Sequence, residues 1–235
     1  MADIDVHFRH NTSSNTMRKH MILGQLYTND ITDKRILEAM AAIPREPFLP
    51  DNLKGAAYVD EDLDVGNNRY LMAPLTFAKL LDLAEITPAC RILNIGCLTG
   101  YTAAVLSRLG AQVIATDSDA SSIVQARTHM QRLNIKNVNL QPVSTMSDGY
   151  AMSAPYDVIV IQGAISFISE TLGSQLAVRG RMVTVRNISK RSDSNIGLGK
   201  GLLVTRLDHR LQYREHFDAS CAILQSFEQA TDFVF

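Results

Sequence analysis

The chain has no tryptophan, only three cysteines and no long hydrophobic run. Cys90, Cys97 and Cys221 are not spaced as metal or redox pairs, so we expect reduced thiols and no bound metal. No apolar run reaches the roughly 18 residues that a membrane-spanning helix needs. The residues from Met1 to Thr16 are polar, which predicts no secretion signal. These absences favour a cytoplasmic protein that does not act at a membrane.

The chain also lacks an excess of charge of either sign. Its 23 Lys+Arg residues nearly balance 24 Asp+Glu residues, for a formal net charge of -1. Nothing forms a basic stripe, so nucleic acid is not an expected partner. The composition is 46% hydrophobic, which suffices to fill a core, and 235 residues accommodate one α/β domain with an appendage.

The hydrophobic pattern changes near residue 89. Before it, apolar residues recur at helical spacing over 32–43, where Thr32 is placed as the cap, and a second helix follows Pro74 and ends near Pro88. After it, short apolar runs alternate with helical segments, as in βαβ units. We therefore expect a tail over 1–16, a helical and substrate-loop region over 17–88 and a core over 89–235, all in one structural domain.

Seven strands are expected in the core. They cover 91–95, 112–116, 137–141, 157–161, 181–186, 201–207 and 213–219. Helices are expected over 101–109 and 120–133, turns over 144–155 and an exposed loop over 187–199. The fold class is α/β, a doubly wound sheet of about seven strands with an N-terminal helical extension. Such a sheet binds its ligands at the carboxyl ends of its strands.

The strongest local signal is the apolar strand 91–95, which turns through Gly96 and Gly100 into a helix. Glycine is needed where φ is positive or where the backbone approaches a ligand, and the helix offers free N–H groups. Asp117, at the end of the next strand, is placed to accept both hydroxyls of a ribose. The glycine spacing departs from the dinucleotide pattern, which favours S-adenosylmethionine, a cofactor without phosphate. A strand-to-helix turn that binds no nucleoside is the alternative.

Several segments resemble, in order and spacing, the protein-L-isoaspartate O-methyltransferases. They are 33–40, 43–50, 57–58, 66–74, 95–106, 154–157 and 172–183. The resemblance runs from about Met21 to Val185. It implies the Rossmann-like class I methyltransferase fold, S-adenosyl-L-methionine as the cofactor, and methylation of the carboxyl group of isoaspartyl residues in damaged proteins.

The substrate side departs from the family pattern. Where the family carries Gln-Thr-Ile-Ser, this chain has Arg69-Tyr70-Leu71-Met72, so Met72 takes the place of the active-site serine. A thioether cannot donate a hydrogen bond. In an extended segment Tyr70 shares a face with Met72, and Arg69 lies on the other. The candidate catalytic positions are therefore Tyr70, the preferred substitute donor, Met72, and Arg69 if the loop bends.

The cofactor side departs as well. The glutamate of the family's first strand is Asn94, its middle glycine is Leu98, and the neighbouring serine position is Thr99. Leu98 either fills the methionine end of the cofactor pocket or forms its wall. The adenine-side acid aligns with Thr145 or, in a shifted register, with the 147–149 segment. The candidate cofactor-binding residues are Asn94, Gly96, Cys97, Leu98, Gly100, Asp117 and Thr145.

Three functions remain open from the sequence. The first is an S-adenosylmethionine-dependent carboxyl methyltransferase whose partners are damaged, isoaspartyl proteins. The second is a methyltransferase of the same fold with another acceptor, since the substrate-side motif is altered. The third is a non-catalytic cofactor-binding or interaction module, for which Leu98 and Asn94 are the motivation. The sequence does not fix the oligomeric state.

Overall fold

Seven strands form the sheet on which the rest of the chain is packed. The computed structural model describes residues 13–190, 195–208 and 210–228. The strands are β3 (Arg91–Ile95), β4 (Gln112–Asp117), β5 (Val138–Pro142), β6 (Tyr156–Ile165), β7 (Leu176–Lys190), β8 (Ile196–Leu207) and β9 (Arg210–Ala222). Their order is β5-β4-β3-β6-β7-β8-β9, with β3 to β7 parallel and the last two antiparallel. The expected doubly wound sheet is confirmed.

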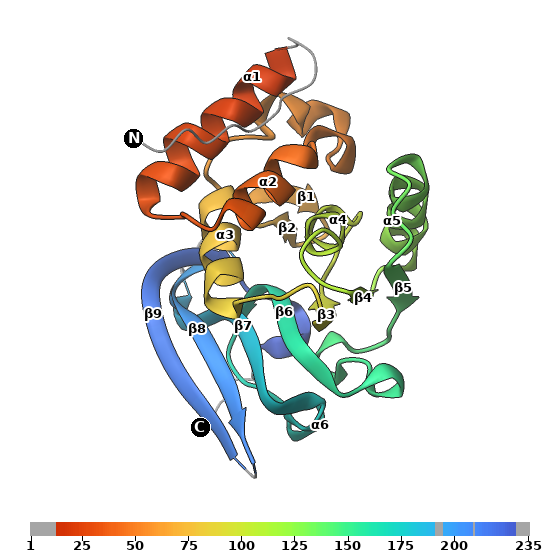
Figure 1. Cartoon of the computed structure of the whole chain (residues 1–235), viewed down its shortest axis with the longest axis vertical. Coiled ribbons are helices and arrows are strands. Elements are labelled where there is room, and N and C mark those ends of the chain that lie inside the picture. The colour runs from red at the N-terminus through yellow and green to blue at the C-terminus, as the bar shows by residue number, and fades with distance from the viewer. Residues whose placement is uncertain (1–12, 191–194, 209, 229–235) are drawn as a thin grey trace, which may run out of the picture.

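From residue 13 to the start of the sheet, the chain is helical except for one small hairpin. The elements are α1 (Ser13–His20), a π-helix (Met21–Leu26), the 3-10 helices Tyr27–Asn29, Glu46–Phe48 and Asp51–Ala56, α2 (Lys34–Ala42), β1 (Leu63–Gly66), β2 (Arg69–Leu71) and α3 (Pro74–Ala84). In Figure 1 α1 and α2 lie at one end of the molecule, and the end of β8 and the start of β9 lie at the other. Across the described ranges, no helix is long and apolar enough to cross a membrane.

Two apolar layers cover the two faces of the sheet. The first contains α3, α4 (Tyr101–Leu106) and α5 (Ala120–Arg132), which pack on strand residues such as Ile92 and Val158. The second contains α6 (Glu170–Ser174) and Phe227, which pack on Leu93 and Ile159. The short 3-10 helices Met146–Asp148, Ala151–Ser153 and Gln225–Phe227 complete the chain. Because neighbouring strand residues face opposite layers, both must be apolar, which explains the continuous hydrophobic runs.

Several boundaries differ from the sequence-based expectations. The helix expected over 32–43 is α2, and its cap is Asp33, which accepts the N–H of Arg35, rather than Thr32. The prediction of a loop over 187–199 is wrong for the described residues at both ends of that segment, because β7 continues to Lys190 and β8 starts at Ile196. Of the expected tail over 1–16, residues 13–16 belong to α1, and residues 1–12 lie outside the described part. Exposed antiparallel strands are polar on one face, which makes them resemble loops.

Candidate functional site

The candidate site lies where the strand order of the sheet reverses. β3 and β6 are neighbours, with β4 and β5 on one side and β7 to β9 on the other. Ligands of doubly wound sheets bind outside the carboxyl ends of the strands at this point. Gly96 follows β3, and the register of β6 shifts between Val160 and Ala164. A shift of this kind re-aims side chains, here that of Gln162.

The turn after β3 is fixed by its backbone. Gly96 and Gly100 have φ angles of 78° and 102°, the left-handed region that favours glycine. The N–H groups of Gly96 and Cys97 both donate to the carbonyl of Thr116, at 2.9 and 3.1 Å. A Cβ at Gly100 would stand 2.9 Å from the Cε of Met130, so this glycine also allows α4 and α5 to approach. The two glycines have the conformational role that the sequence predicts.

Leu98 keeps a backbone conformation suited to glycine although it carries a large side chain. Its φ is 51°, and it is 7% exposed. A left-handed leucine costs roughly 1–2 kcal/mol, so the surrounding contacts must hold it there. Beside it, Asn94 is fully buried and accepts a hydrogen bond from the Thr102 hydroxyl at 2.8 Å. Asn94 thus points into the protein interior and supports α4.

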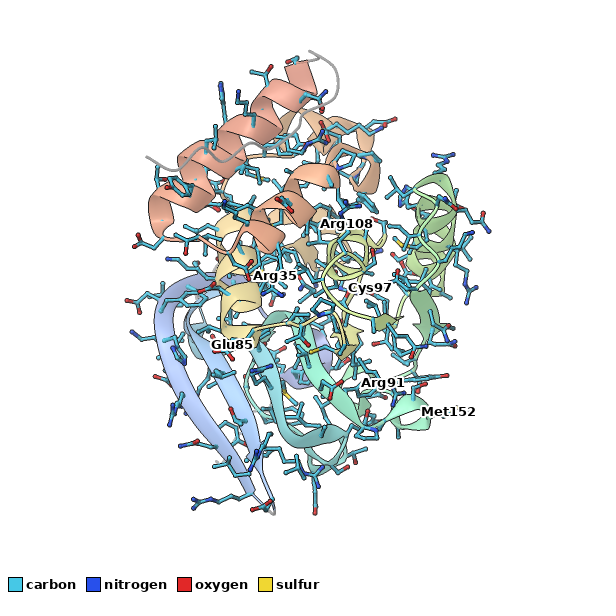
Figure 2. All side chains as sticks on the ribbon, viewed as in Figure 1. Arg35, Glu85, Arg91, Cys97, Arg108 and Met152 are labelled. Atoms are coloured by element: carbon cyan, nitrogen blue, oxygen red, sulfur yellow. The ribbon has the colours of Figure 1, made fainter. Side chains whose placement is uncertain are left out.

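Cys97 is not a reactive thiol in this arrangement. It is 2% exposed, and burial together with the charge of Asp117 raises the pKa of its thiol well above the ordinary value. In Figure 2 Cys97 lies beside α4 in the interior, whereas Arg91, at the opposite end of β3, lies toward Met152. Cys97 fills the turn as a small residue.

Asp117 is the most strongly bonded residue of the site. Its carboxylate is fully buried and makes a two-pronged ion pair with Arg69, with Nη1 to Oδ1 at 2.6 Å and Nη2 to Oδ2 at 2.7 Å. The N–H of Leu98 donates to Oδ2 at 2.8 Å, and that of Asp119 donates to Oδ1 at 3.1 Å. Burial lowers the pKa of Arg69, but the hydrogen bonds and charge of Asp117 outweigh this effect and raise it above its ordinary value. Each oxygen therefore has two donors within the chain.

Arg69 is placed on Asp117 by the β1–β2 hairpin. Asn67 and Asn68, between the two strands, both have φ of 55°, which is typical of a tight hairpin turn. Arg69 then follows at the start of β2, opposite Gly66. The sequence predicted Arg69 as a second candidate for contact with the substrate carboxylate. In the structure it contacts Asp117 instead.

Met72 and Tyr70 line a small cavity at the same end of the sheet. Met72 is 2% exposed, and its carbonyl accepts a hydrogen bond from Arg45 Nη2 at 3.1 Å. Tyr70 is half-buried, and burial followed by the charge of Asp64 raises the pKa of its hydroxyl. Both line a cavity of about 10 Å³, together with Arg69, Gln162 and other residues. This volume is close to what one water molecule needs.

Gln162 is one of the residues of this cavity that sequence reasoning missed. It is 5% exposed, and neither Oε1 nor Nε2 has a hydrogen-bond partner among the described residues. An unpaired buried polar group costs about 1–3 kcal/mol, so two such atoms facing a cavity indicate a place for a polar ligand. The available signal was its position at the end of an apolar strand, where a glutamine interrupts the run.

Thr145 lies further from the ion pair. It is exposed and precedes the 3-10 helix Met146–Asp148, after the end of β5. β5 pairs with β4 so that Pro142 lies opposite Asp117, and the N–H of Val143 donates to the carbonyl of Asp117. The segment from Val143 to Thr145 thus leaves the sheet beside Asp117. The adenine-side role of Thr145 stays a prediction.

Comparison with known proteins identifies the family. The model of the protein-L-isoaspartate(D-aspartate) O-methyltransferase family matches residues 17–194. A protein-L-isoaspartate O-methyltransferase of Koribacter versatilis is 38% identical over 166 residues, which cover 71% of this chain and 74% of that protein. One of Methylorubrum extorquens is 37% identical over 166 residues, covering 71% and 72%. This chain belongs to the protein-L-isoaspartate(D-aspartate) O-methyltransferase family.

Solved structures show the same fold. A protein-L-isoaspartate O-methyltransferase structure matches with a TM-score of 0.74 at 24% identity. The match covers 88% of this chain and 65% of the chain of that structure. A Plasmodium falciparum structure in complex with S-adenosyl-L-homocysteine has a TM-score of 0.67 at 14% identity, and the match covers 92% of this chain and 100% of that one. The chain therefore has the class I methyltransferase fold.

In this structure Arg69 occupies the place on Asp117 where the ribose of the family cofactor, S-adenosylmethionine, would bind. The hydroxyls of a ribose are donors and would need acceptor positions on Asp117, which Arg69 and two backbone N–H groups already fill. Leu224 adds a second obstacle, because a Cβ on Gly96 would stand 3.2 Å from Leu224 Cδ2. The space that the glycine leaves open is thus covered by the chain's own leucine.

Proposed function

We propose that this chain is an S-adenosylmethionine-dependent methyltransferase that forms methyl esters on isoaspartyl residues of damaged proteins, as a step of protein repair. The observation that carries the proposal is the family match over residues 17–194, in which Gly96, Gly100 and Asp117 lie at the strand reversal. Residues 17–88 supply the substrate side, and the sheet from residue 89 onward supplies the cofactor side.

The reaction requires the protein mainly to position the acceptor carboxylate. A carboxylate with a pKa of about 4 is already ionised at neutral pH, so no general base is needed. The site must hold one carboxylate oxygen in line with the methyl group and keep water away. Tyr70 and Gln162 line the cavity as donors, beside Asn68 and Arg69, and the side chain of Met72 offers none. The cavity itself has room for about one water molecule, so we assign the acceptor carboxylate to the surface around Tyr70 outside it.

The expected partners are proteins or peptides that contain isoaspartyl residues, and the proposed location is the cytoplasm. All three cysteines are free and buried, which suits a reducing compartment. The described residues contain no cluster of histidine, cysteine and acidic side chains that would hold a metal ion.

One observation favours a second candidate function, a methyltransferase with a different acceptor. Gln162 places a carboxamide at the strand reversal, and Met72 removes the hydroxyl of the family pattern. A carboxamide both donates and accepts, so it also suits an acceptor that is not a carboxylate.

The test compares two peptides of identical sequence, one with an isoaspartyl residue and one with an aspartyl residue. The full chain is incubated with S-adenosylmethionine, and base-labile methyl groups are measured as released methanol. We expect release from the isoaspartyl peptide alone, with loss of release in Asp117→Ala. Binding of S-adenosylhomocysteine without methyl transfer to either peptide would favour another acceptor. Absence of both binding and transfer would favour a non-catalytic module.

A further inference from the structure

The ion pair between Arg69 and Asp117 is unusual for a group that has to receive a ribose. Its two hydrogen bonds, at 2.6 and 2.7 Å, have the parallel geometry in which a guanidinium binds a carboxylate most strongly. The Asp117 side chain is fully buried, and that of Arg69 is 14% exposed. Water therefore screens the pair weakly, and neutral hydroxyl groups are poor competitors for the same oxygens.

The hairpin that carries Arg69 makes no strand pairing with the seven-stranded sheet, although Leu63 and Leu71 anchor its base in the core. β1 and β2 pair only with each other, in a separate two-stranded sheet. A two-stranded hairpin is marginally stable by itself, so its position depends on side-chain contacts. The residues from Asp64 to Asn68 are mostly exposed. The pair with Asp117 is thus a principal contact that holds the tip of this hairpin over the site.

We propose that Arg69 sets the cofactor affinity of this chain by competing with the ribose hydroxyls for Asp117. The inference rests on the proposed function, since it concerns the same cofactor site. Only the fraction of molecules in which Arg69 has left Asp117 binds the cofactor, so the apparent dissociation constant is the intrinsic one divided by that fraction.

The experiment measures binding of S-adenosylhomocysteine to the full chain by isothermal titration. Arg69→Gln is expected to bind on the order of tenfold more tightly than the wild type, because the competitor is gone. Arg69→Lys keeps the positive charge but lacks the two-pronged guanidinium, so its affinity is expected to lie between those of Arg69→Gln and the wild type. Arg181→Gln is the matched control, because it breaks the 2.6 Å ion pair with Glu85 at the opposite end of the strands. It should bind as the wild type does.

A second measurement asks whether the pair exists in solution without any ligand. Urea midpoints are determined for the wild type, Arg69→Gln, Asp117→Asn and the double variant. A formed pair makes the two single effects non-additive, whereas independent residues give additive effects. Additive effects would overturn the inference.

The binding outcomes separate the inference from the proposed function. Equal affinity of the wild type and Arg69→Gln overturns the role of Arg69 and leaves the proposed function intact. Binding by neither protein overturns the proposed function and the inference together. Adding Asp117→Ala to Arg69→Gln must abolish the gained affinity, and gained affinity that survives this change would show that the ligand binds elsewhere and also overturn the inference.

Discussion

Arg45 offers the sharpest test of how the substrate side of this protein is held. It is fully buried, its Nε donates to the carbonyl of Ala57 at 2.6 Å, and its Nη2 donates to that of Met72 at 3.1 Å. The guanidinium carbon lies 4.8 Å from the centre of the Tyr101 ring. One side chain thus ties the Asp51–Ala56 segment to the end of β2.

The expected cost of Arg45→Met follows from these contacts. Two buried carbonyls lose their donors, at about 1–3 kcal/mol each, and the cation–π contact is lost as well. Part of this loss of stability is offset, because the substitution also removes a buried charge and the unpartnered Nη1 atom. We expect a net loss of about 2–4 kcal/mol in the free energy of unfolding. For a chain of this length, the melting temperature should fall by about 4–16 °C.

The assay is urea unfolding followed by circular dichroism, with thermal melting as a second measurement. Arg186→Met is the control, since Arg186 forms an exposed ion pair with Glu215 and its side chain is 58% exposed. Its effect should stay below about 1 kcal/mol. If Arg45→Met and Arg186→Met unfold at the same urea concentration, the assignment of Arg45 as the tie between these segments is wrong.

Three further predictions concern single residues of the site. Gln162→Leu should raise the free energy of unfolding by about 1–3 kcal/mol, because two unpartnered amide atoms are removed, and a lower urea midpoint would contradict this. Leu98→Gly should be more stable than Leu98→Ala, the reverse of the usual order, because φ at this residue is 51°, and the two urea midpoints decide it. Asp62 also lines the cavity, and its carboxylate accepts the N–H groups of Ala73 and Ala222. Burial raises the pKa of Asp62, so its contribution to stability is full below about pH 3.9 and is lost as the pH rises through the raised value. The stability of Asp62→Asn relative to the wild type should therefore increase across that window in urea titrations, and parallel pH curves would refute the assignment.

The sequence predicted the features that depend on residues close together in the chain, and it did not predict contacts between distant residues. The strand over 91–95 coincides with β3, and the glycine turn has the predicted positive φ at Gly96 and Gly100. Both depend on neighbouring residues, through hydrophobic periodicity and local sterics, and these are visible in the sequence. The family could be recognised from the sequence for the same reason, because its motifs are short and follow one another in a fixed order.

The polar contacts of the site depended on the tertiary structure. Alternation along an extended segment placed Arg69 away from the face of Met72, yet gave no means of finding its partner, which lies 48 positions away. Leu224 follows the last strand and packs over Gly96, a contact between distant parts of the chain. A periodic pattern reports whether a side chain is buried, and the partner it meets is fixed by how separate elements pack. The sequence alone thus determined the fold and the family of this protein, and the tertiary structure decided which side chain bonds the carboxylate expected to receive the ribose.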